Sequence, residues 1–176
     1  MTTTAGNKIL ITGAPGVGKT TLIRRLVRAL DQCHCTGFYT AEIREANARK
    51  GFELVGLDGH KALLAHVEID SPYRVGRYGV DVAGFDRFLA AIGFAHTDTD
   101  VLIVDEIGKM EMFSNQFIQR LDTAFTSDRL VLATISTGGS AAIQRFKKHS
   151  DVTLFTVTRS NRDHLVAEIA AMAADR

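Results

Sequence analysis

Residues 8–23 read KILITGAPGVGKTTLI, and this stretch predicts a strand, a glycine-rich turn and a helix start in direct succession. The run KILIT (8–12) is apolar and rich in β-branched residues, as in a buried strand. Residues 13–20, GAPGVGKT, then match the pattern G-x-x-x-x-G-K-[ST] without a gap. A turn that only joined strand to helix would need neither the lysine nor the hydroxyl of this pattern, so we favour a binding loop.

The chemistry of this loop suits phosphate. Gly13, Gly16 and Gly18 allow backbone conformations in which successive N–H groups curl around phosphate oxygens at the positive end of a helix. Lys19 supplies a cation for the terminal phosphates, and the hydroxyl of Thr20 supplies a ligand for Mg²⁺. Hydrolases, kinases and switches share such loops, so this one indicates a bound nucleoside triphosphate without fixing the reaction. The predicted nucleotide-binding residues are Gly13, Ala14, Pro15, Gly16, Val17, Gly18, Lys19, Thr20 and Thr21.

A second motif, VLIVDEIGKMEMF, spans residues 101–113. Its first four residues predict a strand buried on both faces, and two carboxylates, Asp105 and Glu106, follow at the strand end. Such a strand places an acid near the metal of a phosphate loop, so we assign Asp105 and Thr20 to Mg²⁺. Glu106 is the candidate that orients or deprotonates the attacking water, with a solvated surface acid as the alternative. Lys109 has two open roles, an ion pair with Glu106 or Glu111, or charge stabilisation at the phosphates.

Strand-like and helical patterns alternate along the chain. Strands are predicted at 8–12, 36–43, 51–57, 63–67, 101–105, 129–135 and 152–157. Helical stripes comprise Leu22, Ile23, Leu26, Val27 and Leu30; Phe85, Phe88, Leu89 and Ile92; Phe117, Ile118, Leu121 and Phe125; and Leu165, Ile169 and Met172. This alternation predicts an α/β fold with a mainly parallel central sheet, helices on both faces and a small antiparallel edge or insertion within 36–67. Residues 71–81 lack periodicity and are predicted to form a loop.

The composition narrows the classes of protein that fit. The chain has 176 residues, of which 45% are hydrophobic and 23% charged, and we expect one domain spanning residues 1–176. A formal net charge of +1 gives no strong nucleic-acid signal. No window approaches a membrane span and no signal-peptide pattern opens the chain, so we expect a cytoplasmic monomer that does not enter a membrane. Cys33 and Cys35 are the only cysteines and predict reduced thiols.

Five segments resemble the family of small P-loop nucleoside-triphosphatases of the cancer-related nucleoside-triphosphatase type. They are GAPGVGKTTLI (13–23), GFYTAEIREANARKGFELV (37–55), RVGRYGVD (74–81), VLIVDEIGKMEMFS (101–114) and VTRSNRDHL (157–165). The resemblance implies the additional-strand, catalytic-glutamate (RecA-like) branch of P-loop proteins, in which one strand separates the phosphate-loop strand from the acidic strand. It also implies Mg²⁺-dependent hydrolysis of several nucleoside triphosphates, ATP and GTP among them, to diphosphate and phosphate.

The resemblance also extends to individual residues. It implies that Glu106 is the catalytic glutamate and that Asp105 and Thr20 serve the metal. It gives Thr134, near the end of a predicted strand, the place of a γ-phosphate sensor. After this strand the chain departs from the family pattern, because it runs ISTGGS where relatives often carry a proline.

Several cations are candidates to stabilise charge at the phosphates. Lys19 belongs to the phosphate loop, and Lys109, Arg44 and Arg49 are further candidates. For each arginine, a solvated or ion-paired surface position is the alternative. Arg162, at the start of the last predicted helix, is a candidate contact for the nucleobase.

Two other functions fit part of the sequence. A nucleotide or small-molecule kinase is a common use of one P-loop domain, but a water-activating Glu106 would waste its triphosphate and no arginine-rich lid is evident. A nucleotide-dependent switch or nucleic-acid partner lacks support, because the base-reading N-K-x-D pattern of GTP switches is missing and the charge is near neutral.

Overall fold

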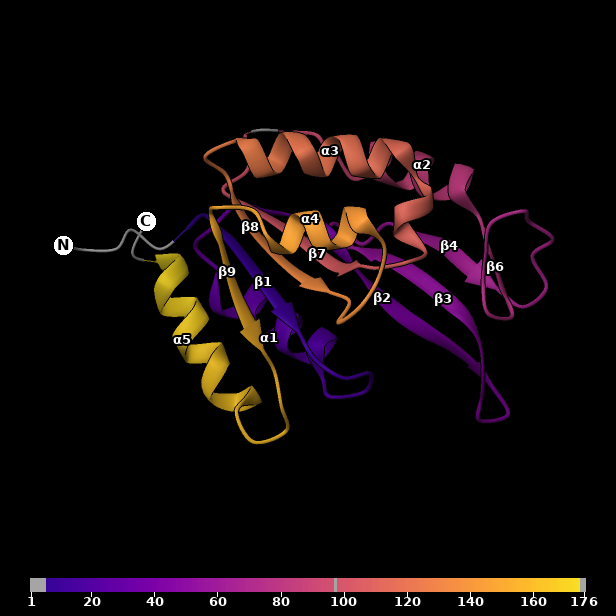
Figure 1. The fold of residues 1–176 in the computed structure, drawn as a ribbon, viewed down its shortest axis with the longest axis horizontal. Coiled ribbons are helices and arrows are strands. Elements are labelled where there is room, and N and C mark those ends of the chain that lie inside the picture. The colour runs from indigo at the N-terminus through magenta and orange to yellow at the C-terminus, as the bar shows by residue number, and fades with distance from the viewer. Residues whose placement is uncertain (1–5, 97, 175–176) are drawn as a thin grey trace.

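A computed structural model of the protein describes residues 6–96 and 98–174. The strands of these residues form one nine-stranded sheet in the order β5-β6-β4-β3-β2-β7-β8-β1-β9 (Figure 1). The strands are β1 (Lys8–Thr12), β2 (Cys35–Glu45), β3 (Ala48–Gly56), β4 (Lys61–His66), β5 (Arg74–Val75), β6 (Tyr78–Val80), β7 (Val101–Ile107), β8 (Leu130–Ile135) and β9 (Val152–Thr156). The helices are α1 (Lys19–Ala29), α2 (Val82–Ala91), the 3₁₀ helix η1 (Glu111–Phe113), α3 (Asn115–Thr126), α4 (Ala141–Lys147) and α5 (Arg162–Ala174).

Half of the sheet is parallel. β1 pairs with β8 and β9, and β7 pairs with β8 and β2, all in parallel orientation. β8 therefore separates β1, which leads into the phosphate loop, from β7, which carries the acids, and the additional-strand prediction is confirmed. Because parallel strands end at the same edge of the sheet, the residues that follow β1, β7 and β8 gather at one place.

The other half of the sheet is antiparallel, as the sequence predicts. β2 pairs with β7 only as far as Tyr39, opposite Asp105, whereas its pairing with β3 continues to Glu45. The second half of β2 therefore projects past the parallel strands as a hairpin with β3. Its two-residue turn, Ala46 and Asn47, has φ values of 44° and 64°, typical of a type I′ turn.

The prediction of a loop at residues 71–81 is wrong. β5 and β6 form a small hairpin there, and β6 joins the sheet by pairing with β4. The two strands have two and three residues, which is too short for an alternating pattern to show in the sequence.

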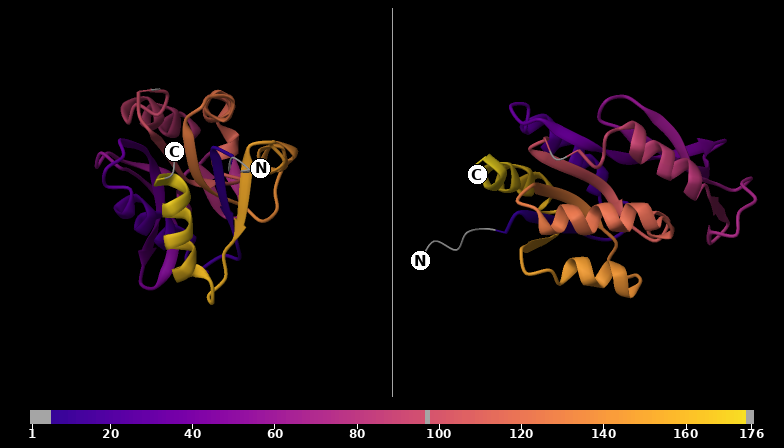
Figure 2. Two further views of the ribbon diagram at one scale, coloured as in Figure 1. Left: turned by 90° about the vertical axis from the view of Figure 1, so that its left-hand side faces the viewer. Right: turned by 90° about the horizontal axis from the view of Figure 1, so that it is seen from above.

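Helices cover both faces of the sheet, as predicted. Ile9 and Ile11 of β1 pack in a cluster with residues of α1 and α5, whereas Leu10 between them packs in a second cluster with residues of α2, α3 and α4. This alternation is the normal consequence of the two-residue period of a strand. Figure 2 shows α2 and α3 on the side of the sheet away from α5.

Phenylalanines fill much of the second cluster. Phe38 of β2 lies with its ring centroid 5.7 Å from that of Phe85, 5.8 Å from Phe88 and 6.2 Å from Phe117. Phe85 and Phe88 belong to one predicted helical stripe and Phe117 to another, and the structure confirms these stripes as buried faces of α2 and α3. They fix β2 against α2 and α3 and so hold the base of the projecting hairpin.

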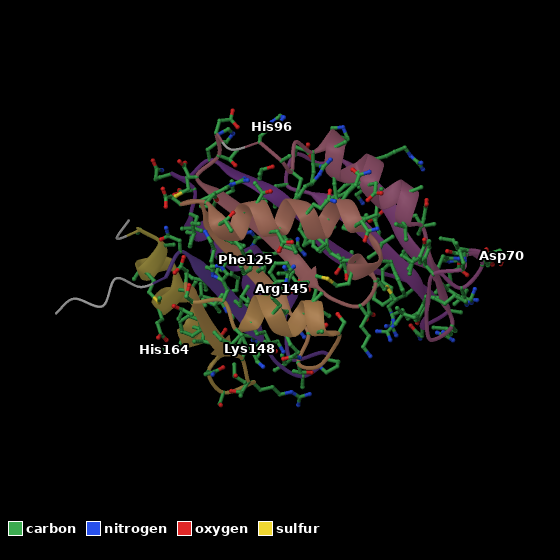
Figure 3. The ribbon with its side chains drawn as sticks, turned by 45° about the horizontal axis from the view of Figure 1, so that its top comes forward. Asp70, His96, Phe125, Arg145, Lys148 and His164 are labelled. Atoms are coloured by element: carbon green, nitrogen blue, oxygen red, sulfur yellow. The ribbon has the colours of Figure 1, made fainter. Side chains whose placement is uncertain are left out.

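Helix α4 has no counterpart among the sequence predictions. It has seven residues, too few to show a helical period, and Ile143 and Phe146 are its buried residues. It packs beside α3, where Arg145 forms a 2.7 Å ion pair with Asp122 and the ring of Phe125 lies 4.8 Å from that of Phe146. Figure 3 shows Phe125 and Arg145 close together on these two helices. No helix within residues 6–96 and 98–174 is long and apolar enough to cross a membrane.

Candidate active site

The glycine-rich loop wraps the start of α1. Gly18 has φ 102°, a left-handed conformation that favours glycine, and the N–H of Val17 donates to the carbonyl of Ala14 at 3.2 Å. The helix start has no side-chain cap, and its first turn contains no acidic residue. Its N–H groups therefore remain available to an anion at the positive end of the helix dipole.

Lys19 turns back over this loop. Its Nζ atom donates to the carbonyl oxygen of Gly13 at 3.0 Å and lies 3.9 Å from Oε2 of Glu106. The side chain is 12% exposed, so the ammonium group is largely withdrawn from solvent yet borders the cavity described below. This is the location that the sequence predicts for a cation serving the terminal phosphates.

Asp105 lies between two threonine hydroxyl groups. Thr20 donates to Oδ2 of Asp105 at 2.6 Å, and Thr134 donates to Oδ1. Asp105 is 1% exposed, and this burial raises the pKa of its carboxyl group, although the hydroxyl bonds of Thr134 and then Thr20 act in the opposite direction. The structure thus brings together the two residues that the sequence assigns to the metal. Thr134 is fully buried and directs its hydroxyl to Asp105.

Glu106 borders the same space, and its side chain is 29% exposed. Its Oε1 atom accepts a 2.6 Å hydrogen bond from Ser136, and its Oε2 atom faces Lys19. The peptide bond between Asp105 and Glu106 is cis. Ser136 is not among the residues predicted from the sequence, although a hydroxyl residue directly after the fully buried strand β8 is a usable signal.

Two charged residues follow Glu106 in the chain. Lys109 borders the cavity and forms no ion pair with any residue in the described part of the chain, so the ion-pair interpretation finds no support. Glu111, in contrast, is 5% exposed, and burial raises its pKa from 4.5 to about 8, with Glu106 and Asp105 adding to the shift. The sequence indicates Glu111 only as an ion-pair partner for Lys109 and gives no sign of its burial.

Lys19, Thr20, Glu106 and Lys109 line a cavity of about 650 Å³. One part is formed by the phosphate loop, and another by residues 136–139 after β8. The projecting hairpin contributes a third part, and of its residues here only Arg49 is among those predicted from the sequence. Its contributing residues are Thr40, Glu42, Arg49 and Phe52.

The other predicted site residues differ in whether they line this cavity. Seven of the nine predicted loop residues line it, while Ala14 is exposed beside it and Val17 is buried in the core. Arg49 lines the cavity, whereas Arg44 is not among its lining residues. Arg162 lies against the loop, because its Nη1 atom is 3.4 Å from the carbonyl oxygen of Val17.

The fold and the site together define a P-loop NTPase fold. The phosphate loop precedes α1, an acidic strand lies two positions away in the sheet, and an extra strand separates the two. Comparison with known proteins assigns the chain more narrowly. The chain belongs to the family whose model is described as NTPase, which matches residues 8–170.

Named relatives cover nearly the whole chain. It is 42% identical over 166 residues to nucleoside-triphosphatase THEP1 of Thermotoga maritima, covering 94% of each chain. It is 37% identical to the cancer-related nucleoside-triphosphatase of Homo sapiens, covering 92% of this chain and 93% of the relative.

Two solved structures have the same fold. The crystal structure of THEP1 from the hyperthermophile Aquifex aeolicus superposes with a TM-score of 0.87 at 32% identity, covering 94% of this chain and 98% of the other. The solution structure of a human cancer-related nucleoside triphosphatase gives a TM-score of 0.79 at 35% identity, covering 93% and 95%.

Proposed function

We propose that this protein hydrolyses nucleoside 5′-triphosphates, ATP and GTP among them, to diphosphate and phosphate in a Mg²⁺-dependent reaction. The observation that carries the proposal is the position of Glu106, whose carboxylate faces Lys19 of the phosphate loop across 3.9 Å within one cavity. The relatives named nucleoside-triphosphatases support the same reaction class. The proposal treats residues 1–176 as one domain that acts as a cytoplasmic monomer.

Binding would rest on the phosphate loop. The uncapped N–H groups at the start of α1 would bind phosphate oxygens, and Lys19 would exchange its bond to the Gly13 carbonyl for the β- and γ-phosphates. Arg162, which lies against Val17, would contact the nucleobase or the ribose side of the substrate.

The residues near Asp105 fit a magnesium site. Thr20 and Asp105 form a 2.6 Å pair of oxygen atoms, and Mg²⁺ prefers oxygen ligands while keeping several of its waters. Thr20 would then ligate the ion, with Asp105 binding it directly or through a water. When bound, Mg²⁺ would offset negative charge on the β- and γ-phosphates. Thr134 would hold Asp105 in place, and this is the role we propose for it in preference to sensing the γ-phosphate.

Glu106 would act on the water. Ser136 holds Oε1, so Oε2 is left to accept a proton from the attacking water. The water oxygen bonds to the γ-phosphorus as the bond to the β–γ bridging oxygen breaks, and the diphosphate leaves. Lys19 and Lys109, which both border the cavity, would stabilise the charge that builds up on the phosphate oxygens.

The test is phosphate release from ATP, GTP, CTP, UTP and deoxynucleotides, with and without Mg²⁺ and without any acceptor. Glu106→Gln should bind triphosphate as the wild type does and lose turnover, because the amide cannot take the proton. Lys19→Ala should weaken triphosphate binding and abolish turnover. The matched control is Glu68→Gln, an acid whose side chain is 81% exposed, which should keep full activity. Unchanged hydrolysis in Glu106→Gln would show that this mechanism is wrong. Little phosphate release from the wild type, together with phosphoryl transfer to an added acceptor, would point to a kinase.

A further inference from the structure

The β2–β3 hairpin brings a second set of charged residues to the triphosphate cavity. Arg49 and Glu42 both line it, although they lie far along the chain from the phosphate loop and from the acidic strand. The proposed mechanism uses neither of them. Hydrolysis in P-loop proteins is slow unless an arginine, from the same chain or a partner, stabilises the transition state.

Arg49 is held in a fixed orientation. Its Nη1 atom donates to Oε1 of Glu42 at 2.7 Å, and its Nε atom donates to the hydroxyl of Tyr78 at 3.1 Å. The guanidinium carbon lies 5.2 Å from the ring centroid of Phe52 and 5.9 Å from that of Tyr78. The remaining amino group, Nη2, makes no hydrogen bond to any residue within the described ranges, so its donors are available to a ligand.

The charges around Arg49 do not cancel. Glu42 accepts from Arg49 through Oε1 and from Arg44 through Oε2 at 2.6 Å. These hydrogen bonds, that of Arg49 first, lower the pKa of Glu42 and keep its carboxylate ionised. Two cations thus share one anion, and a positive charge is left over at the cavity. An anchored, preorganised cation stabilises developing negative charge better than a mobile one, because it needs no reorganisation during the reaction.

The other cations of this region are less suited to the role. Arg44 is occupied by Glu42 and by the carbonyl of Asn47, and it is not among the cavity-lining residues. Arg77 donates to the carbonyl of Arg49 and to the hydroxyl of Tyr78, so it supports the anchor. Lys109 borders the cavity, but an ammonium group lacks the planar set of donors that matches phosphoryl oxygens.

We propose that Arg49 is a catalytic residue of this site, which uses its Nη2 donors to stabilise charge on the γ-phosphoryl oxygens as the β–γ bond breaks. Glu42 and Tyr78 are the positioning residues that orient it. The chain therefore carries its own catalytic arginine on the β2–β3 hairpin. This inference rests on the proposed hydrolysis and adds to it a residue that the loop and the acidic strand do not supply.

The test compares Arg49→Ala and Arg49→Lys with the wild type in three measurements. These are steady-state ATP hydrolysis, the affinity for a non-hydrolysable ATP analogue, and the affinity for ADP with tetrafluoroaluminate, which mimics the transition state. Both variants should lose about 10²- to 10³-fold in kcat, the size expected for one preorganised donor. Their affinity for ADP with tetrafluoroaluminate should fall by a similar factor, whereas affinity for the ATP analogue should change by less than about threefold.

Further variants separate catalysis from structure. Glu42→Gln and Tyr78→Phe should each lower kcat by a smaller factor, because they loosen the anchor and leave the guanidinium in place. Lys50→Ala is the matched control, since Lys50 lies on the same hairpin, forms its ion pair with Glu45 and is not among the cavity-lining residues. It should keep wild-type kcat. Thermal unfolding midpoints should be similar for the variants of Arg49, Glu42 and Lys50, because the ion pairs of these residues are partly exposed to solvent.

Two outcomes would overturn the inference. The first is hydrolysis by Arg49→Ala within about threefold of the wild type. The second is an equal loss of affinity for the ATP analogue and for the tetrafluoroaluminate complex, which would make Arg49 a ground-state binding residue. A wild-type protein that releases no phosphate would instead refute the proposed hydrolysis, so failures of the two proposals are distinguishable.

Discussion

Glu111 offers a direct test of how a buried acid near Asp105 and Glu106 affects the stability of the fold. The residue lies in η1, within the same motif as Asp105 and Glu106, and it is 5% exposed. Burial raises its pKa from 4.5 to about 8, and the charges of Glu106 and Asp105 add to the shift. We predict that Glu111→Gln removes a large part of the pH dependence of the free energy of unfolding.

The magnitude follows from proton linkage. Between pH 4.5 and about 8 the folded protein keeps a proton on Glu111 that the unfolded chain releases. Protonation therefore stabilises the folded state fully below pH 4.5, and this contribution is lost as the pH rises to about 8. At about 1.4 kcal/mol for each pH unit, the whole contribution amounts to about 5 kcal/mol.

The assay is urea unfolding of the wild type and Glu111→Gln at pH 5, 6, 7, 8 and 9, in EDTA and without nucleotide. The stability of the wild type relative to the variant should fall steadily across this range and level off above pH 8. Glu68→Gln is the control, because its side chain is 81% exposed, and its difference from the wild type should stay flat. Parallel pH profiles for the wild type and Glu111→Gln would refute the reasoning.

Two further predictions concern packing. Phe117→Ala should lower the free energy of unfolding by about 3–5 kcal/mol in urea titrations, because the fully buried ring contacts the rings of Phe38 and other phenylalanines. A loss of less than about 1 kcal/mol would contradict the described core. Gly108→Ala should lower kcat about threefold to tenfold in a phosphate-release assay, because its Cβ would lie 2.9 Å from Oε2 of the buried Glu111, whose carboxyl group must then shift near Glu106. Wild-type turnover in Gly108→Ala would show that this close packing does not position Glu106.

The parts of the fold that the sequence predicts are those with local signals. A strand of five residues followed by a glycine-rich turn identifies β1 and the phosphate loop. The apolar stripes of α2 and α3 likewise match their buried faces. In contrast, α4 and the β5–β6 hairpin are too short for a period to emerge, and they form because the surrounding chain supplies their partners.

The same division applies to the site. The sequence indicated Thr20, Asp105 and Glu106, because each stands at a fixed place in a recognisable motif. Their proposed roles in catalysis remain predictions. That Thr20 meets Asp105 across 85 positions of sequence follows from the order of the parallel strands, which the family resemblance implies.

Only the tertiary structure shows what surrounds this centre. Ser136 meets Glu106 because β8 inserts beside β7, and Glu111 is buried because η1 turns back against the sheet. Arg49 reaches the cavity because β2 extends past the parallel strands and turns back into β3. Tyr78, 29 residues away in sequence, accepts a hydrogen bond that orients the Arg49 side chain. A motif reflects what phosphate binding requires of residues that are neighbours in sequence. The burial and orientation of side chains depend instead on contacts between segments that are distant in sequence, and these contacts form only when the sheet assembles.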